Sequence, residues 1–80
     1  NVVDACVSPD GQKLLITYPQ RMEVYSLDRQ GNTGSMNIWS GVTDNLVTAR
    51  FIDQAGTTVM AGDKAGRTYE IIGGRIMSVY

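Results

Sequence analysis

Eight carboxylates, seven basic side chains and one thiol are the groups of this chain that could do chemistry, and histidine is absent. General acid–base catalysis needs a histidine or paired carboxylates, but the acids are dispersed, mostly in turns and at strand ends. Nucleophilic catalysis needs a cysteine or serine beside a base, and no histidine is present to activate Cys6. We therefore expect no catalytic residue, and we expect Cys6 to be a packing residue or a free thiol.

Metal and cofactor sites have equally little support. A structural zinc site takes about four Cys or His ligands, and the chain has one cysteine. The stretch Asp28-Arg29-Gln30-Gly31-Asn32 only faintly suggests a calcium loop, since alternating acidic ligands and a closing Glu are missing. The glycine-containing stretches 31–34 and 62–66 do not precede a helix, which a phosphate cradle requires. We expect neither a metal nor a cofactor.

The charge pattern argues against nucleic acid and membranes as partners. The formal net charge is −1, and the charges are scattered without the basic face of a nucleic-acid binder. Apolar runs such as Leu14-Leu15-Ile16 are far shorter than the roughly 18 residues of a membrane span. The single cysteine favours a reducing compartment, so we expect a cytoplasmic location.

A repeat with a period of about 44 residues organises the chain. Val3-Asp4-Ala5-Cys6-Val7 matches Val47-Thr48-Ala49-Arg50-Phe51, with apolar residues at every second position in both copies. This alternation predicts a β-strand with one apolar face. The turn Ser8-Pro9-Asp10-Gly11 follows the first copy, and Asp53-Gln54-Ala55-Gly56 follows the second. Pro, Asp and Gly suit a tight turn, so each copy predicts a hairpin.

Each unit contains four predicted strands, and the chain shows no sustained 3.6-residue apolar period that would predict a helix. The first unit, residues 1–45, has strands at Val2–Val7, Lys13–Thr17, Met22–Leu27 and Met36–Ser40, with a polar loop over Asp28–Gly34. The second, residues 46–80, has strands at Leu46–Ile52, Thr57–Ala61, Arg67–Ile72 and Arg75–Val79. Gly73-Gly74 suits a two-residue hairpin turn. The sequence thus predicts an all-β chain of two four-stranded antiparallel units.

Two such units resemble the blades of WD40 β-propellers, in repeat length and in two hairpins. Ala5–Leu15, which contains Ser8-Pro9-Asp10-Gly11, is similar to the first hairpin of that family, and Ala61–Tyr69 is similar to the second. The Trp-Asp pair and the buried histidine of the family are absent, and Ala65 stands in place of the turn Asp. The resemblance implies two degenerate blades whose first strands, with small Ala5 and Ala49, line a central channel.

The resemblance also implies where the loops lie. Residues 18–21, 43–45 and 63–65 would share one rim, and residues 8–13, 28–34 and 54–56 the other. Candidate partner-binding residues are Tyr18, Arg21, Asp44, Asp63, Lys64 and Trp39. Tyr18 and Arg21 are favoured, because Tyr and Arg are enriched at binding hot spots. Trp39 is a possible anchor for a partner or a sugar, but packing between blades is the favoured interpretation.

Two blades cannot close a propeller ring, so their faces and edges need neighbours. The chain could self-assemble as a ring-forming homo-oligomer, complete the remainder of a longer propeller, or dock onto another incomplete propeller. A fortuitous repeat in a closed sandwich or barrel is the alternative. We expect a non-enzymatic protein-interaction scaffold. The alternatives are an oligomeric sugar- or ligand-binding propeller and a part of a propeller-bearing hydrolase.

Overall fold

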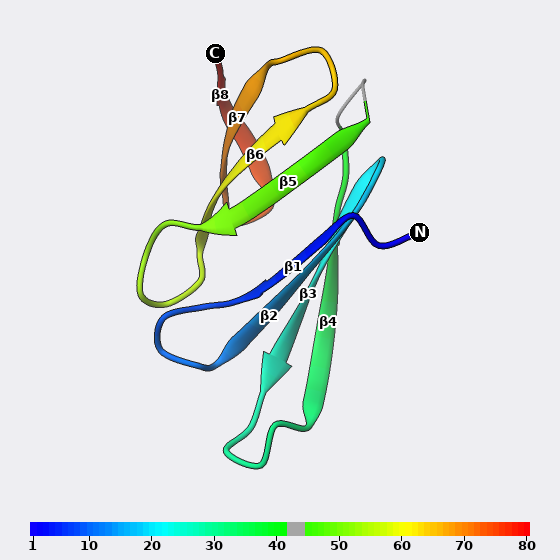
Figure 1. Cartoon of the computed structure of the whole chain (residues 1–80). Coiled ribbons are helices and arrows are strands. Elements are labelled where there is room, and N and C mark those ends of the chain that lie inside the picture. Colours follow the sequence, from blue (N-terminus) through cyan, green and yellow to red (C-terminus); the bar gives the residue numbers. More distant parts are fainter. Residues whose placement is uncertain (42–44) are drawn as a thin grey trace.

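The computed structural model describes residues 1–41 and 45–80. Its strands form two four-stranded antiparallel sheets, each with neighbouring strands in sequence order (Figure 1). The first sheet comprises β1 (Asp4–Val7), β2 (Lys13–Tyr18), β3 (Arg21–Leu27) and β4 (Thr33–Trp39). The second comprises β5 (Leu46–Phe51), β6 (Thr58–Asp63), β7 (Thr68–Ile72) and β8 (Arg75–Val79). The described residues include no helix, and hence none that could cross a membrane. The predicted all-β architecture is confirmed.

The predicted turn chemistry explains two of the hairpins. The backbone N–H of Gly11 donates to the carbonyl of Ser8 at 2.8 Å, and Gly11 has a φ of 76°. Gly73 and Gly74 have φ values of 58° and 84°, as a two-residue type I′ turn requires of both central residues. Because L-residues with a Cβ rarely adopt positive φ, glycine is needed at these positions.

Two strands extend at least two residues beyond their predicted bounds. β4 begins at Thr33 rather than Met36, so the predicted loop over residues 28–34 is shorter. This edge strand is exposed along most of its length and therefore lacks the alternation that reveals a half-buried strand. β6 continues to Asp63 rather than ending at Ala61. Gly62 pairs with Thr48 and Thr68 within the sheet, and a Cβ on it would lie 3.3 Å from the Thr48 methyl group, a close approach that glycine allows.

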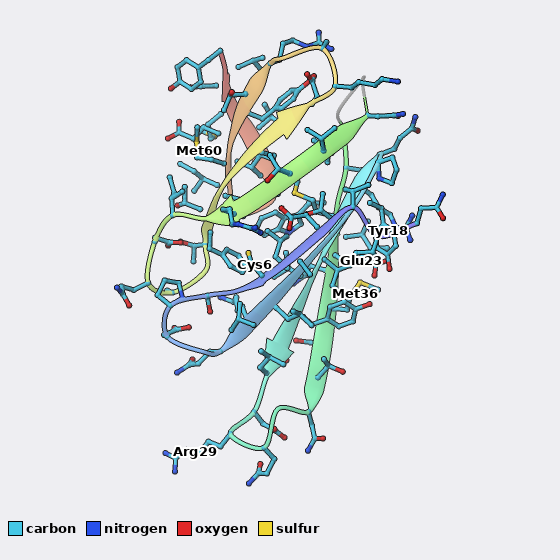
Figure 2. The ribbon with its side chains drawn as sticks, viewed as in Figure 1. Cys6, Tyr18, Glu23, Arg29, Met36 and Met60 are labelled. Carbon is cyan, nitrogen blue, oxygen red and sulfur yellow. The ribbon has the colours of Figure 1, made fainter. Side chains whose placement is uncertain are left out.

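The two sheets pack face to face around one core. β1 and β2 lie beside β5, and Cys6 lies between the sheets (Figures 1 and 2). We call the faces that meet the inner faces, and those turned away the outer faces. The buried apolar residues of the core are Leu15, Met22, Val24, Leu46, Ala49, Val59, Ala61, Tyr69 and Ile71. Cys6, Trp39, Phe51 and Ile76 pack against them.

The two sheets stack front to back. Residues at matched positions of the repeat lie on the inner face of the second sheet but on the outer face of the first. Ala49 and Phe51 face the core, whereas the matching Ala5 and Val7 lie on the outer face of the first sheet, where Val7 is 51% exposed. Placing Val47 with Ala49 on the apolar face was wrong. A register shift between Leu46 and Thr48 leaves Val47 51% exposed and gives its core position to Leu46.

Candidate functional site

The loops around residues 18–21, 45 and 63–65, which were predicted to share one rim, are joined by hydrogen bonds. The Gln20 side-chain amide donates to the Asn45 side-chain oxygen at 3.4 Å, and the Leu46 N–H donates to the Pro19 carbonyl at 2.6 Å. The Lys64 N–H donates to the Asn45 carbonyl at 2.7 Å, while the Lys64 side chain is exposed. Of the predicted binding residues, Asp44 lies outside the described residues.

Of the loops predicted for the other rim, the turns at residues 8–13 and 54–56 are joined by hydrogen bonds. The Asp10 N–H donates to the Gln54 carbonyl at 3.1 Å, and the Lys13 ammonium donates to the Ala55 carbonyl at 3.1 Å. The Asp28 carboxylate accepts the Asn32 N–H at 2.8 Å, so this acid closes a turn. Within residues 1–41 and 45–80, no three His, Cys, Asp or Glu side chains are grouped so that they could hold a metal ion.

Tyr18 and Arg21 belong to a polar cluster on the outer face of the first sheet, with Glu23 and Tyr25. The Arg21 guanidinium lies 3.9 Å from the Tyr18 ring centroid, a cation–π contact, and its Nε donates to Glu23 Oε2 at 3.1 Å. The Tyr25 hydroxyl donates to Glu23 Oε1 at 2.7 Å. The hydrogen bonds from Tyr25 and then Arg21 outweigh the burial of Glu23 and lower its pKa, so the carboxylate is charged. Tyr18 and Glu23 lie on the side of the first sheet turned away from the second (Figure 2).

Asp63 belongs to a second polar cluster, on the inner face of the second sheet. Its carboxylate is buried and accepts the Tyr69 hydroxyl at 2.6 Å, Arg67 Nε at 3.0 Å and the Arg67 N–H at 2.9 Å. The Tyr69 hydrogen bond, with those from Arg67, outweighs burial and lowers the pKa of Asp63 to about 2. The candidate Asp63 thus turns its charge inward, toward its own chain, and its exposed neighbour Lys64 carries the free charge of this turn.

The two clusters occupy matched positions. Glu23 pairs with Ile16 in the first sheet as Tyr69 pairs with Ala61 in the second, and the repeat aligns Ile16 with Ala61. The matched pairs of the clusters are Tyr18 with Asp63, Arg21 with Arg67, and Glu23 with Tyr69. Both clusters therefore have an arginine at the same position. The acid of each cluster stands where the other cluster has a tyrosine, on the neighbouring strand. One cluster is covered by the neighbouring sheet and the other is not.

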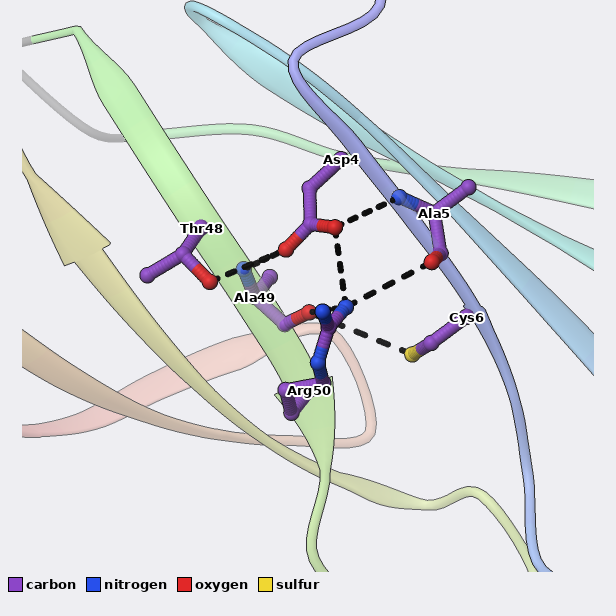
Figure 3. A network of polar contacts seen from close by, with 6 residues as sticks. All are labelled: Asp4, Ala5, Cys6, Thr48, Ala49 and Arg50. Atoms are coloured by element: carbon purple, nitrogen blue, oxygen red, sulfur yellow. Dashed lines mark hydrogen bonds and ion pairs between the residues drawn. The ribbon is translucent and has the colours of Figure 1, made fainter.

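Asp4 ties the two sheets together along β1 and β5 (Figure 3). Its carboxylate accepts the Thr48 hydroxyl at 2.9 Å, the Ala49 N–H at 3.2 Å and Arg50 Nη1 at 2.9 Å. Burial raises the pKa of Asp4, but these hydrogen bonds together outweigh it and the net pKa is lowered. The Cys6 thiol points toward the Ala49 carbonyl at 3.9 Å, and this free cysteine packs against the core.

Trp39 lies at the end of β4 and packs against the second sheet, in agreement with the favoured interpretation. A Cβ on Gly74 would be 2.9 Å from its indole ring, so the β7–β8 turn fits under the tryptophan only as glycine. Beside Trp39 is a pocket of about 440 Å³ between the sheets. Its lining comprises Lys13, Val24, Asn37, Ile38, Trp39, Gly56, Thr57, Gly73 and Gly74.

Sequence reasoning missed Glu23 and Tyr25. Arg21, Glu23 and Tyr25 stand at every second position of β3 and therefore share a face, which was the available signal. Comparison with protein-family models and with curated protein sequences found no match to this chain, so its residues alone must carry a functional argument.

Proposed function

We propose that the chain is a non-enzymatic interaction scaffold made of two WD40-like blades, with protein as its partner. The observation that carries this proposal is the uncovered apolar outer face of the first sheet. Val7, Met36 and Ile38 are 51%, 42% and 58% exposed there, beside half-buried Leu14 and Ile16. Apolar patches of this kind mark protein interaction surfaces.

The state of the acids supports a structural rather than a catalytic role for them. Asp4, Glu23 and Asp63 each have a lowered pKa, caused by donors from their own chain. General acid–base catalysis near neutral pH favours a group that titrates there, and these three carboxylates remain charged.

A photo-crosslinking amino acid at Ile38, on the exposed outer face, tests the scaffold proposal in the organism that makes the chain. We expect a discrete crosslinked protein, because a partner would shield this position. The same amino acid at Arg29, on the exposed β3–β4 loop, is the control (Figure 2). Equal crosslinking at both positions, or none at Ile38, would contradict the proposal.

The pocket beside Trp39 supports a second candidate function, binding of a sugar or a similar polar ligand. An indole ring with amide, hydroxyl and ammonium groups around it offers both stacking and hydrogen bonds. Trp39 is the single tryptophan, so its fluorescence reports on this pocket directly. Quenching by simple sugars that is lost in Asn37→Ala would support this function, and an unchanged spectrum with every sugar would exclude it.

A further inference from the structure

We propose that the outer face of the first sheet docks a further four-stranded sheet, one whose docking face is apolar like the inner face of the first sheet. The inference rests on the proposed scaffold function and names the partner's chemistry. The unmodified second sheet of another copy of this chain does not meet that requirement.

The chain already contains one example of the proposed interface. In it, the inner face of the first sheet covers the inner face of the second. Positions on the outer face of the first sheet match positions on the covered inner face of the second sheet. The residues at the matched positions listed next are apolar or aromatic in both sheets. The pairs are Ala5 with Ala49, Val7 with Phe51, Leu14 with Val59, Ile16 with Ala61, and Tyr25 with Ile71. A second sheet stacked in the same way would therefore cover a surface of the same kind.

The polar cluster on this outer face does not oppose docking. Arg21 and Glu23 form an ion pair, and Tyr25 satisfies the second carboxylate oxygen. The matched cluster of Asp63, Arg67 and Tyr69 is already accommodated at the covered interface. Because the charges are paired within the sheet, the partner need not bring a compensating charge.

A second copy would offer the outer face of its second sheet, and that face is too polar. Its matched residues differ from those that form the existing interface. The pairs are Cys6 with Arg50, Leu15 with Met60, Met22 with Thr68, and Val24 with Glu70. Stacking two copies front to back would bring Glu70 to the position that Val24 occupies in the existing interface. Arg50 is paired with Asp4 of its own chain, but burying the charge of Glu70 in an apolar interface is unfavourable, so the occupant must be a different sheet.

A graft tests both parts of the proposal with the whole chain. Thr68→Met with Glu70→Val gives the second sheet the residues that Met22 and Val24 supply to the existing interface. Thr68→Ser with Glu70→Gln is the matched control, because it removes the same charge without adding apolar surface. Light scattering after size exclusion measures the mass over a range of concentrations, and circular dichroism confirms that each variant is folded.

We expect the wild type and the control to remain at the 8.7 kDa monomer mass. The graft should gain mass with concentration, to about twofold or more, by front-to-back association. Ile38→Asp in the graft background should restore the monomer, since Ile38 lies on the exposed outer face that would be covered.

Three results would overturn the proposal. A folded graft that stays monomeric shows that the face does not dock a sheet, and a graft that Ile38→Asp leaves associated shows that another surface is used. A wild-type oligomer that Ile38→Asp dissociates makes a second copy the occupant. Association of the graft without crosslinking at Ile38 in cells would retain the docking surface but reject the scaffold function.

Discussion

The two sheets carry the same arginine beside an acid and a tyrosine, yet only one of these clusters is covered. In the second sheet Asp63 is buried between Arg67 and Tyr69 under the first sheet. In the first sheet the acid is on the neighbouring strand, at Glu23, and the cluster faces outward. Both acids are buried and are bonded by a tyrosine and an arginine of their own sheet, so the neighbouring sheet changes what lies over a cluster and not the bonds within it.

The largest difference in stability should appear when matched residues on an inner face and on an outer face are each shortened to alanine. Leu15→Ala removes a fully buried side chain between the sheets and should cost about 3 kcal/mol in the free energy of unfolding. Met60→Ala, at the matched position on the outer face of the second sheet, should cost less than about 1 kcal/mol, because little cavity is created. Urea denaturation measures both. Equal losses would mean that the outer face of the second sheet is also covered.

Lowering the pH should remove the stability that the buried carboxylate of Asp63 contributes. The pKa of Asp63 is about 2 in the folded chain, below its ordinary value of 3.8. Its charge therefore contributes stability above about pH 4, and this contribution is lost as the pH falls toward 2. Asp63→Asn should destabilise the chain at pH 7, and the gap from wild type should narrow toward pH 2. Thermal melts at several pH values measure the gap, and a gap independent of pH would contradict the assignment.

A smaller effect should distinguish the two tyrosines. Tyr69→Phe removes a buried hydroxyl from Asp63 and should cost about 1–2 kcal/mol in the free energy of unfolding. Tyr25→Phe removes the corresponding donor from Glu23 on the outer face, where water replaces it more easily, so its cost should be clearly smaller. Urea denaturation of both variants makes the comparison. A larger loss for Tyr25→Phe would show that the outward cluster is the better shielded one.

Thr17 should show the smallest change. Its hydroxyl is buried on the inner face and has no hydrogen-bond partner among the described residues. Thr17→Val replaces an unsatisfied donor with a methyl group of similar size, so stability should be unchanged or higher by up to about 1 kcal/mol. Thr17→Ser keeps the hydroxyl and loses the methyl group, and it should be less stable. A marked loss in Thr17→Val would mean that the hydroxyl has a partner after all, such as water.

The sequence was sufficient for most of the architecture. Alternation and Pro-Asp-Gly or Gly-Gly turns predicted eight strands, because local backbone preferences determine that feature. The two rims were predicted only from the resemblance to WD40 blades. The sequence did not reveal that β4 starts at Thr33, since an exposed edge strand needs no apolar pattern. It also misplaced Val47, because a register shift moves side chains between faces without a distinctive residue.

The candidate site was harder to predict, because its environment depends on packing between the sheets. Tyr18 and Arg21 were predicted to lie in a rim loop, but they are the last residue of β2 and the first of β3 and touch on the outer face of the first sheet. The sequence did not single out Glu23, which joins Arg21 to Tyr25. Nor did an Asp beside an exposed Lys indicate that Asp63 turns inward. The burial of that acid, with Tyr69 and Arg67 bonded to it, is a property of the packed structure and has no signature in the sequence around it.

The order of strands within each sheet has a consequence for how the chain folds. Every described strand pairs only with its neighbours in sequence, so each sheet can form from local contacts, which are quick to make. The contacts from Asp4 and Cys6 to β5, which join the sheets, span 43 to 46 residues, and they must close later. During synthesis the first sheet is completed before β5–β8 exist. For that interval its inner apolar face lacks the second sheet that covers it in the folded chain, and the nascent chain is most exposed to aggregation then.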